Sequence, residues 1–304
     1  MKIGQPILNL AWLAAFAPAL AAAGDNTPEF GFAADAGYQY DSNVNVAEID
    51  TSTGQSDSAL LLNAGVNASL PLTGKLDFKL AYDYGQTSYR QFEEFDLAIH
   101  HGQGALAYGI AGFDTALTLD RYAVRLGGEP FLGINQVSPS VARLFGEKLY
   151  LRAAFTRADK QYAATAERNA TNDEIRADAY ILFDGMQRYL SLGYTRNTED
   201  ALDAELDYAA DRAMLAYGHR VDLGTLPLDL KTRLQFEQRT YANVTEAIDV
   251  PRRDRRLRAG VSAAVPLSEH FVLKSEVEYA ANHSNLATAR YDEFVCSATL
   301  AVAF

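Results

Sequence analysis

The chain has 304 residues, of which 48% are hydrophobic and 22% are charged, a composition that by itself suits a soluble protein of one or two domains. Its net charge of −12 argues against nucleic acid as a partner, because binding to phosphates needs a basic surface. The single cysteine, Cys296, excludes a disulfide framework and a cysteine-based zinc site.

The first 23 residues have the pattern of a secretory signal peptide. Lys2 is followed by an apolar stretch over 7–20 and then by small residues up to Ala23, the order that precedes signal cleavage. We therefore expect a signal peptide at 1–23 and one mature domain at 24–304. No later stretch reaches the roughly 18 to 20 continuous apolar residues of a transmembrane helix, so helices are not expected to cross a membrane.

Beyond residue 28 the chain alternates between apolar and polar residues, as a strand with two different faces does. The clearest segment is 226–237, in which leucines and Phe236 interleave with charged residues and glutamine. About fourteen segments follow this pattern, with a count uncertain by two. They lie near 29–40, 58–70, 75–86, 96–108, 112–122, 131–144, 148–158, 174–183, 188–197, 207–221, 226–238, 255–266, 270–281 and 291–304.

The connections between these segments alternate between short and long. The expected long ones are near 41–57, 87–95, 123–130, 159–173, 198–206, 239–254 and 282–290. This order predicts an all-β fold, a single transmembrane antiparallel up-and-down β-barrel of about 14 strands, with periplasmic turns and external loops. The location that follows is the bacterial cell outer membrane, with outer-membrane lipids around the barrel.

The chain ends in a strand with alternate apolar residues and a terminal phenylalanine. Leu300, Val302 and Phe304 resemble the C-terminal signal by which bacterial outer-membrane barrels are recognised for insertion. The barrel-assembly machinery is therefore an expected partner during insertion.

Charged residues occupy the face of the strands that is opposite the apolar one. Because Arg or Lys facing lipid at the midplane costs roughly 2 to 4 kcal/mol, these residues are expected to face the lumen. We predict a basic wall on the late strands, formed by Lys231, Arg233, Arg256, Arg258 and Lys274. We predict an opposing acidic wall, formed by Asp77, Asp83, Asp114 and Asp120. Such walls would set up a transverse field across a pore; alternatively, the charges form cross-strand pairs that only neutralise the interior.

The sequence contains only weak indications of a catalytic or metal-binding set of residues. The five histidines are scattered, and His100 and His101 are expected on opposite faces of one strand. Asp41, Asn43 and Asn45 imitate the start of a calcium loop, but Val46 stands where glycine is needed. We therefore expect no enzyme activity, no cofactor and no metal site. Cys296 falls on the lipid-facing side of the last strand, where we expect an inert apolar residue.

One short motif resembles a known family. Residues 37–45, reading GYQYDSNVN, look like the first strand and loop of the barrel domain of surface lipoprotein assembly modifiers, and Ser284, Asn285, Tyr291 and Asp292 resemble that family's final loop and strand. The resemblance in layout covers about 29–304 and implies a fourteen-strand translocation barrel. In that family a periplasmic helical-repeat domain usually precedes the barrel, and no such domain fits before residue 29 here.

Three functions remain open from the sequence. The first is export or translocation across the outer membrane, with an exported lipoprotein or a separate periplasmic protein as partner. The second is a monomeric diffusion porin for small solutes. The third is a plugged structural or adhesive barrel that acts through its external loops.

Overall fold

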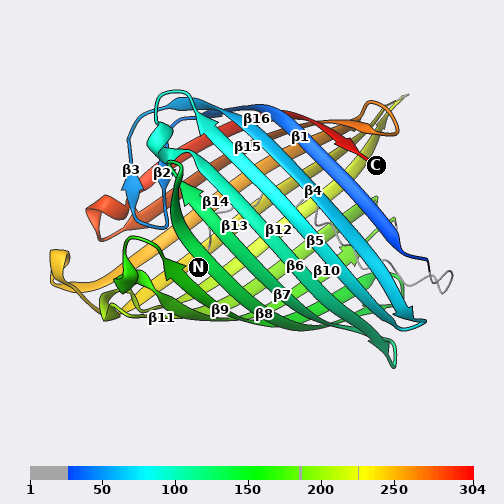
Figure 1. Cartoon of the computed structure of the whole chain (residues 1–304), viewed down its shortest axis with the longest axis horizontal. Helices are drawn as coiled ribbons and strands as arrows, with labels where there is room; N and C mark the ends of the chain where they lie inside the picture. Colours follow the sequence, from blue (N-terminus) through cyan, green and yellow to red (C-terminus); the bar gives the residue numbers. More distant parts are fainter. Residues whose placement is uncertain (1–26, 185–186, 225) are drawn as a thin grey trace.

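In the computed structural model, which describes residues 27–184, 187–224 and 226–304, the chain forms a closed antiparallel barrel of fourteen strands (Figure 1). The expected signal peptide, 1–23, lies outside the described residues. The barrel strands are β1 (Glu29–Asp41), β4 (Asp57–Thr73), β5 (Leu76–Tyr89), β6 (Leu97–Ile110), β7 (Phe113–Leu126), β8 (Glu129–Phe145), β9 (Leu149–Tyr162), β10 (Ala170–Leu182), β11 (Arg188–Ala201), β12 (Tyr208–Leu223), β13 (Leu226–Thr245), β14 (Val250–Pro266), β15 (Phe271–Ser284) and β16 (Tyr291–Ala303). The predicted fold class and strand number are confirmed.

Each strand pairs with its neighbours in sequence, and β1 closes the ring by pairing with β16. At this closure Tyr38 lies opposite Ala298 and Asp35 opposite Ala301. Beyond the last paired residues, the Phe304 amide donates to the Phe32 carbonyl at 2.9 Å. The predicted insertion residues therefore belong to the strand that closes the barrel, with the side chains of Leu300 and Phe304 exposed on the outside.

The two ends of the barrel differ. Tight turns join the strands at the end where β1 begins and β16 ends, which we call the turn end. The opposite end, the loop end, carries a two-stranded sheet of β2 (Asn45–Val46) and β3 (Thr51–Ser52). In the described part of the chain it also carries five single-turn 3₁₀ helices: η2 (Glu93–Phe95), η3 (Ala166–Arg168), η4 (Ala204–Leu206), η5 (Glu246–Ile248) and η6 (Ala287–Ala289). Among the described residues, no helix is long and apolar enough to span a membrane.

The sequence predictions of two long connections are wrong. The connection expected at 123–130 is a turn of two residues, Gly127 and Gly128, whose positive φ angles of 56° and 81° suit glycine. The loop expected over 239–254 is mostly strand, because β13 continues to Thr245 and β14 begins at Val250. Beyond Phe236 both faces of β13 are polar over 237–240, so the alternation that reveals strands in the sequence is lost there although the pairing with β14 continues.

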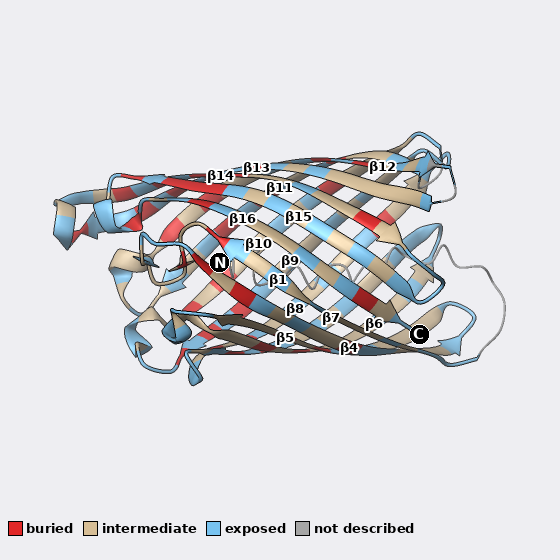
Figure 2. Cartoon of the chain, turned by 90° about the horizontal axis from the view of Figure 1, so that it is seen from above, coloured by how far each residue is buried: buried red, intermediate tan, exposed pale blue. Residues whose placement is uncertain are grey.

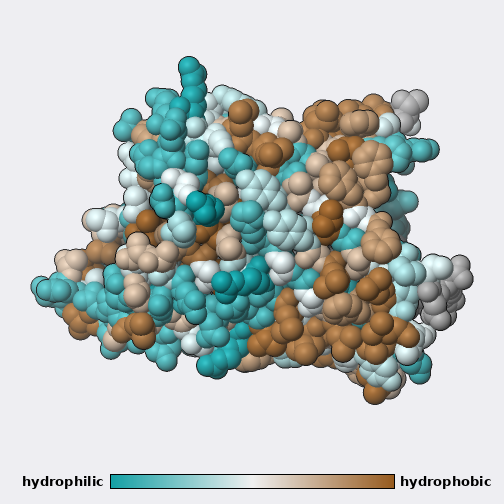
Figure 3. Space-filling view, viewed as in Figure 1, coloured by the Kyte–Doolittle hydropathy of each residue, from teal (hydrophilic) through white to brown (hydrophobic). Residues whose placement is uncertain are grey.

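The apolar belt covers only part of the barrel's height. In Figure 3 hydrophobic side chains gather over the part nearer the turn end, and hydrophilic ones cover the loop end. Buried residues are concentrated toward the loop end (Figure 2), where the interior is filled. The polar part of the barrel therefore projects beyond the belt on the loop side.

Candidate functional site

The connection between β1 and β4, residues 42–56, folds into the barrel instead of projecting from it; we call it the inner loop. Val44 near its root is fully buried, and the Val44 amide donates to the Gln55 carbonyl at 3.0 Å. The tip of the loop contacts residues of β9 and β14. Because β9 lies six strands from β1 in the ring, the inner loop crosses the lumen near the loop end.

Asn43 holds the root of the inner loop. Its side-chain oxygen accepts hydrogen bonds from the Ser52 hydroxyl at 2.6 Å and the Gly54 amide at 3.0 Å, and its amide nitrogen donates to the Asp292 carbonyl at 3.0 Å. Among the described residues, no group of three or more His, Cys, Asp or Glu side chains is arranged to hold a metal ion. The asparagine-rich start of this loop is thus a fixed turn.

Two carboxylates at the tip of the inner loop bind cationic and hydroxyl groups of β9 and β14. Glu48 accepts a hydrogen bond from the Tyr162 hydroxyl at 2.9 Å and lies 4.0 Å from the Lys160 ammonium. Asp50 accepts two hydrogen bonds from the Arg252 guanidinium, at 2.6 and 2.8 Å. We call the Asp50–Arg252 pair the latch.

The charge environment keeps Asp50 ionised. Burial alone would raise the pKa of its carboxyl, but the hydrogen bonds and charge of Arg252, together with the charges of Arg256 and Arg168, outweigh burial and lower that pKa below its usual value. The latch is therefore an ion pair at neutral pH.

An apolar cluster lies on the inner faces of β6 to β9. Its buried members are Ile99, Tyr122, Val124, Leu132, Ile134, Ala158 and Tyr162. Val46 and Ala47 of the inner loop line a cavity of about 70 Å³ together with Val124 and Leu132 of this cluster. The loop thus has an apolar neighbour on one side and charged neighbours on the other.

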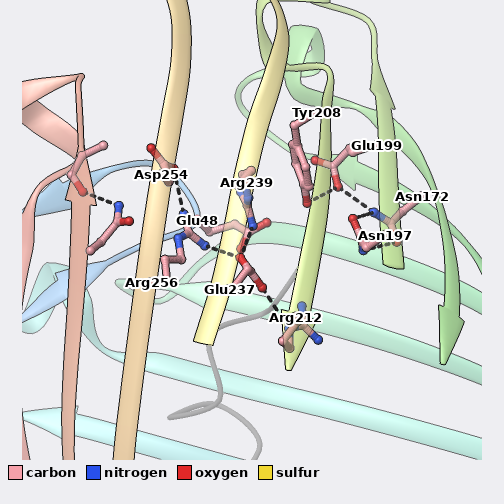
Figure 4. A network of polar contacts seen from close by, with 12 residues as sticks. Glu48, Asn172, Asn197, Glu199, Tyr208, Arg212, Glu237, Arg239, Asp254 and Arg256 are labelled. Carbon is pink, nitrogen blue, oxygen red and sulfur yellow. Dashed lines mark hydrogen bonds and ion pairs between the residues drawn. The ribbon is translucent and has the colours of Figure 1, made fainter. Parts of the chain in front are cut away.

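The charged side is a network across β10 to β14 (Figure 4), and the ion pair between Glu199 and Lys160 extends it to β9. Glu237, fully buried, accepts from the Arg212 Nε at 2.9 Å and from the Arg239 guanidinium at 3.3 Å. The Arg239 guanidinium carbon stacks 3.9 Å from the centre of the Tyr208 ring. Glu199 pairs with Lys160 and accepts from Asn172. Burial of so many charges is tolerable only because they are paired and hydrogen-bonded.

The residues of the predicted basic wall lie on three adjacent strands and face the lumen. Lys231 and Arg233 are on β13, Arg256 and Arg258 on β14, and Lys274 on β15. Toward the loop end they are buried and paired: the guanidinium of Arg258 lies 3.1 Å from Glu278. Lys231 and Arg233, nearer the turn end, are only half-buried, and Lys274 lies 3.7 Å from Asp35.

The residues of the predicted acidic wall lie on β5 and β7. His101 of the intervening β6 bridges two of them, with Nδ1 3.3 Å from Asp83 and Nε2 2.9 Å from Asp120. The imidazole stacks on Tyr122 with 4.2 Å between ring centres. Asp77 and Asp114 lie close to the turn end, half-buried and exposed respectively.

His100, by contrast, faces outward and contacts the Tyr82 hydroxyl at 2.7 Å. The two histidines therefore occupy opposite faces of β6, as the sequence predicts, but the sequence does not predict the contacts of His101 with Asp83 and Asp120. The alternation of side chains along each strand places His101, Asp83 and Asp120 inside the barrel. Their proximity depends on the strand register, which the sequence does not reveal.

The ring order places the two walls across the lumen from each other. In a ring of fourteen, the strand seven places away lies opposite, so β14 faces β7 and β13 faces β6. Sequence reasoning did not place the inner loop. The available signal in the sequence was the acidic tip of this loop, Glu48 and Asp50, because carboxylates are attracted to a basic wall inside the barrel.

No family model matches this sequence, and no curated protein matches it significantly. Solved structures are similar in fold. An anion-selective porin from Comamonas acidovorans is 13% identical with a TM-score of 0.52, over 92% of this chain and 100% of that one. The outer-membrane protein OmpT of Vibrio cholerae is 9% identical with a TM-score of 0.53, over 92% of this chain and 99% of that one.

This similarity shows the fold, and the exposed apolar belt around a closed barrel completes the assignment. The chain is a bacterial outer-membrane β-barrel. On β16, Cys296 lies between Tyr40 of β1 and Val277 of β15, both exposed on the outer face. The cysteine therefore faces lipid.

Proposed function

We propose that this barrel is a channel for small solutes whose bore is restricted by the inner loop. The observation that carries the proposal is the latch, which fixes the tip of the loop to β14 while Glu48 contacts β9 on the other side of the lumen. A channel narrowed in this way passes small solutes and retains larger ones, as pores with an inward constriction do.

The turn-end half of the lumen supports the proposal because it is lined with charged side chains that water reaches. The side chains of Arg152 and Arg176 are each 38% exposed, and that of Lys274 is 24% exposed. Their charges favour a wet vestibule. The proposed role is passive transport and includes no chemical step by the protein.

Export of a lipoprotein, with that lipoprotein or a separate periplasmic protein as partner, is the second proposal. It rests on the resemblance of 37–45 to the assembly modifiers, and it requires a polypeptide to displace the inner loop and break the latch. A plugged adhesive barrel is the third possibility. For all three, we propose cleavage of 1–23 and insertion by the barrel-assembly machinery through the β16 signal.

Single-channel recording in planar bilayers tests the channel. One variant replaces 45–54 with two glycines; because Val44 and Gln55 are bonded through their backbones, a two-residue connection fits there. We expect a small steady conductance from the native chain and a several-fold larger one from the shortened chain.

The control replaces 246–249, the tip between β13 and β14, with two glycines and should leave conductance unchanged. Conductance only after shortening the inner loop would instead support the plugged barrel. If neither protein conducts, although heat-modifiable gel mobility shows that each is folded, the channel proposal is refuted.

A further inference from the structure

Two arginines project from the outside of β14 just beyond the apolar belt. Going toward the loop end, the outward residues of this strand are Val261, Ala259 and Leu257, followed by Arg255 and Arg253. Both arginines are exposed. On the adjacent β15 the same rows change from Tyr279 and Ala281 to His283.

The strand register places these residues in continuous rows. Arg255 pairs with Gln238 of β13 on one side and His283 of β15 on the other, while Arg253 pairs with Thr240. Successive outward residues on one strand are about 6.8 Å apart. The two guanidinium groups therefore arise within the first two polar rows above the belt, at the depth of lipid headgroups.

Some outward arginines on other strands have a carboxylate partner: Arg157 pairs with Asp173 at 3.2 Å, and Arg196 pairs with Asp211. Exposed Arg121 and Arg125 of β7 instead bond to the Asn135 side chain and to the Gly128 carbonyl. Within the described parts of the chain, no carboxylate lies within ion-pairing distance of the Arg253 or Arg255 guanidinium. In a protein with a net charge of −12, two uncompensated cations in successive rows of one strand call for an external anion.

The surface around them is concave and polar. A groove of about 550 Å³ is lined by Arg253, Arg255, Gln238, Thr240 and His283, and also by Asp254, whose buried carboxylate accepts hydrogen bonds from Arg252. Amide and hydroxyl groups in the groove can also donate hydrogen bonds to phosphate oxygens. The planar guanidinium group can donate two parallel hydrogen bonds to one phosphate group.

We propose that this groove, the Arg253–Arg255 groove, binds the phosphate groups of a phosphorylated glycolipid in the outer leaflet. The loop end of an outer-membrane barrel faces the outside, so the groove lies at the level of outer-leaflet headgroups. Acyl chains of the bound lipid would lie against the apolar residues below it, beginning at Leu257 of β14 and the exposed Tyr279 of β15. This inference rests on the fold and the belt alone, independently of any transport function.

The test compares lipid retention by the full-length purified chain. The double variant R253Q/R255Q removes the two cations, and R157Q/R196Q is the matched control, because it removes two outward arginines that already have carboxylate partners. The probe is diphosphorylated lipid A, with fully dephosphorylated lipid A as the comparison. Bound lipid is counted by native mass spectrometry across a concentration series.

We expect the native chain and the control to retain diphosphorylated lipid A, and the double variant to bind it about tenfold more weakly, since charge-assisted hydrogen bonds to phosphate are lost. Equal binding by the double variant would overturn the proposal. So would equal retention of the dephosphorylated lipid by the native chain. Displacement of the lipid by millimolar inorganic phosphate would show a site for free anions instead. Heat-modifiable mobility confirms that each variant is folded.

Discussion

Arg258 and Glu278 form a buried ion pair on the inner faces of β14 and β15. Their side chains are 9% and 16% exposed, with 3.1 Å between Nη1 and Oε1. Replacing Arg258 with Gln leaves the Glu278 carboxylate buried without its cation, which typically costs about 3 to 5 kcal/mol. We expect this loss in the free energy of unfolding, measured by urea titration in lipid vesicles.

The control for this prediction is an exposed pair in the same barrel. Arg157 and Asp173, on the outside of β9 and β10, have side chains 54% and 40% exposed. Because exposed pairs contribute about 1 kcal/mol or less, Arg157→Gln should change stability little. Equal losses in R157Q and R258Q would show that burial does not determine the cost, and R258Q/E278Q should recover part of the loss.

At the residue level, the sequence predicts which way a side chain faces but not what it touches. The parity of a strand places Asp83, Asp120 and His101 inside the barrel. Their contacts require that Asp83 lie opposite His101 on β6, and Tyr122 opposite His101 on β7. A shift of one residue in either register would separate them, and the sequence alone leaves the register open.

At the scale of a single element, the inner loop should make the conductance of the barrel depend on pH. The pKa of Asp50 is lowered in the latched state, whereas a released carboxyl has a pKa of about 3.9. A lowered pKa means that the latch contributes fully above about pH 4 and is lost as the pH falls through the latched value. We therefore expect single-channel conductance to rise on acidification below about pH 4.

Asp50→Asn removes the charge and should give the larger conductance already at pH 7, with no further rise in acid. Asp249→Asn is the matched control, because Asp249 is an exposed carboxylate at the tip of another connection and has a φ of 55°, which asparagine also tolerates. An acid-induced rise of native size in D50N would assign the effect to another group.

Element prediction succeeds where one face of a strand meets lipid. Leu234 and Phe236 of β13 alternate with Arg233 and Gln235, and the strand is evident. Beyond Phe236 the same strand presents Gln238 and Thr240 outward and Arg239 inward, so polarity no longer distinguishes the faces. The sequence therefore locates the membrane-spanning part of each hairpin and underestimates its length above the belt.

For the whole molecule, fourteen strands follow from the sequence because closing a barrel needs only the alternation and the order of connections. The filled loop end does not follow, since it depends on a segment with little periodicity crossing six strands to reach Tyr162. Burial near the loop end and a wetter half near the turn end are the consequence. The charges that remain accessible to ions are thus those nearest the turn end.

These accessible charges predict the ion selectivity of the proposed channel. Lys231 and Arg233 on β13 and Asp77 and Asp114 on β5 and β7 line opposite sides of the turn-end half. Removing positive charge from one side changes the local potential, and about one kT of potential changes the local ion concentration roughly threefold.

Under a salt gradient, K231Q/R233Q should shift the reversal potential toward cation selectivity, and D77N/D114N should shift it toward anion selectivity. The quadruple variant should return close to the native value, because its two changes act on the same lumen with opposite sign. If all three variants keep the native reversal potential, these four charges do not control ion selectivity, and the transverse field would have to be abandoned as its origin.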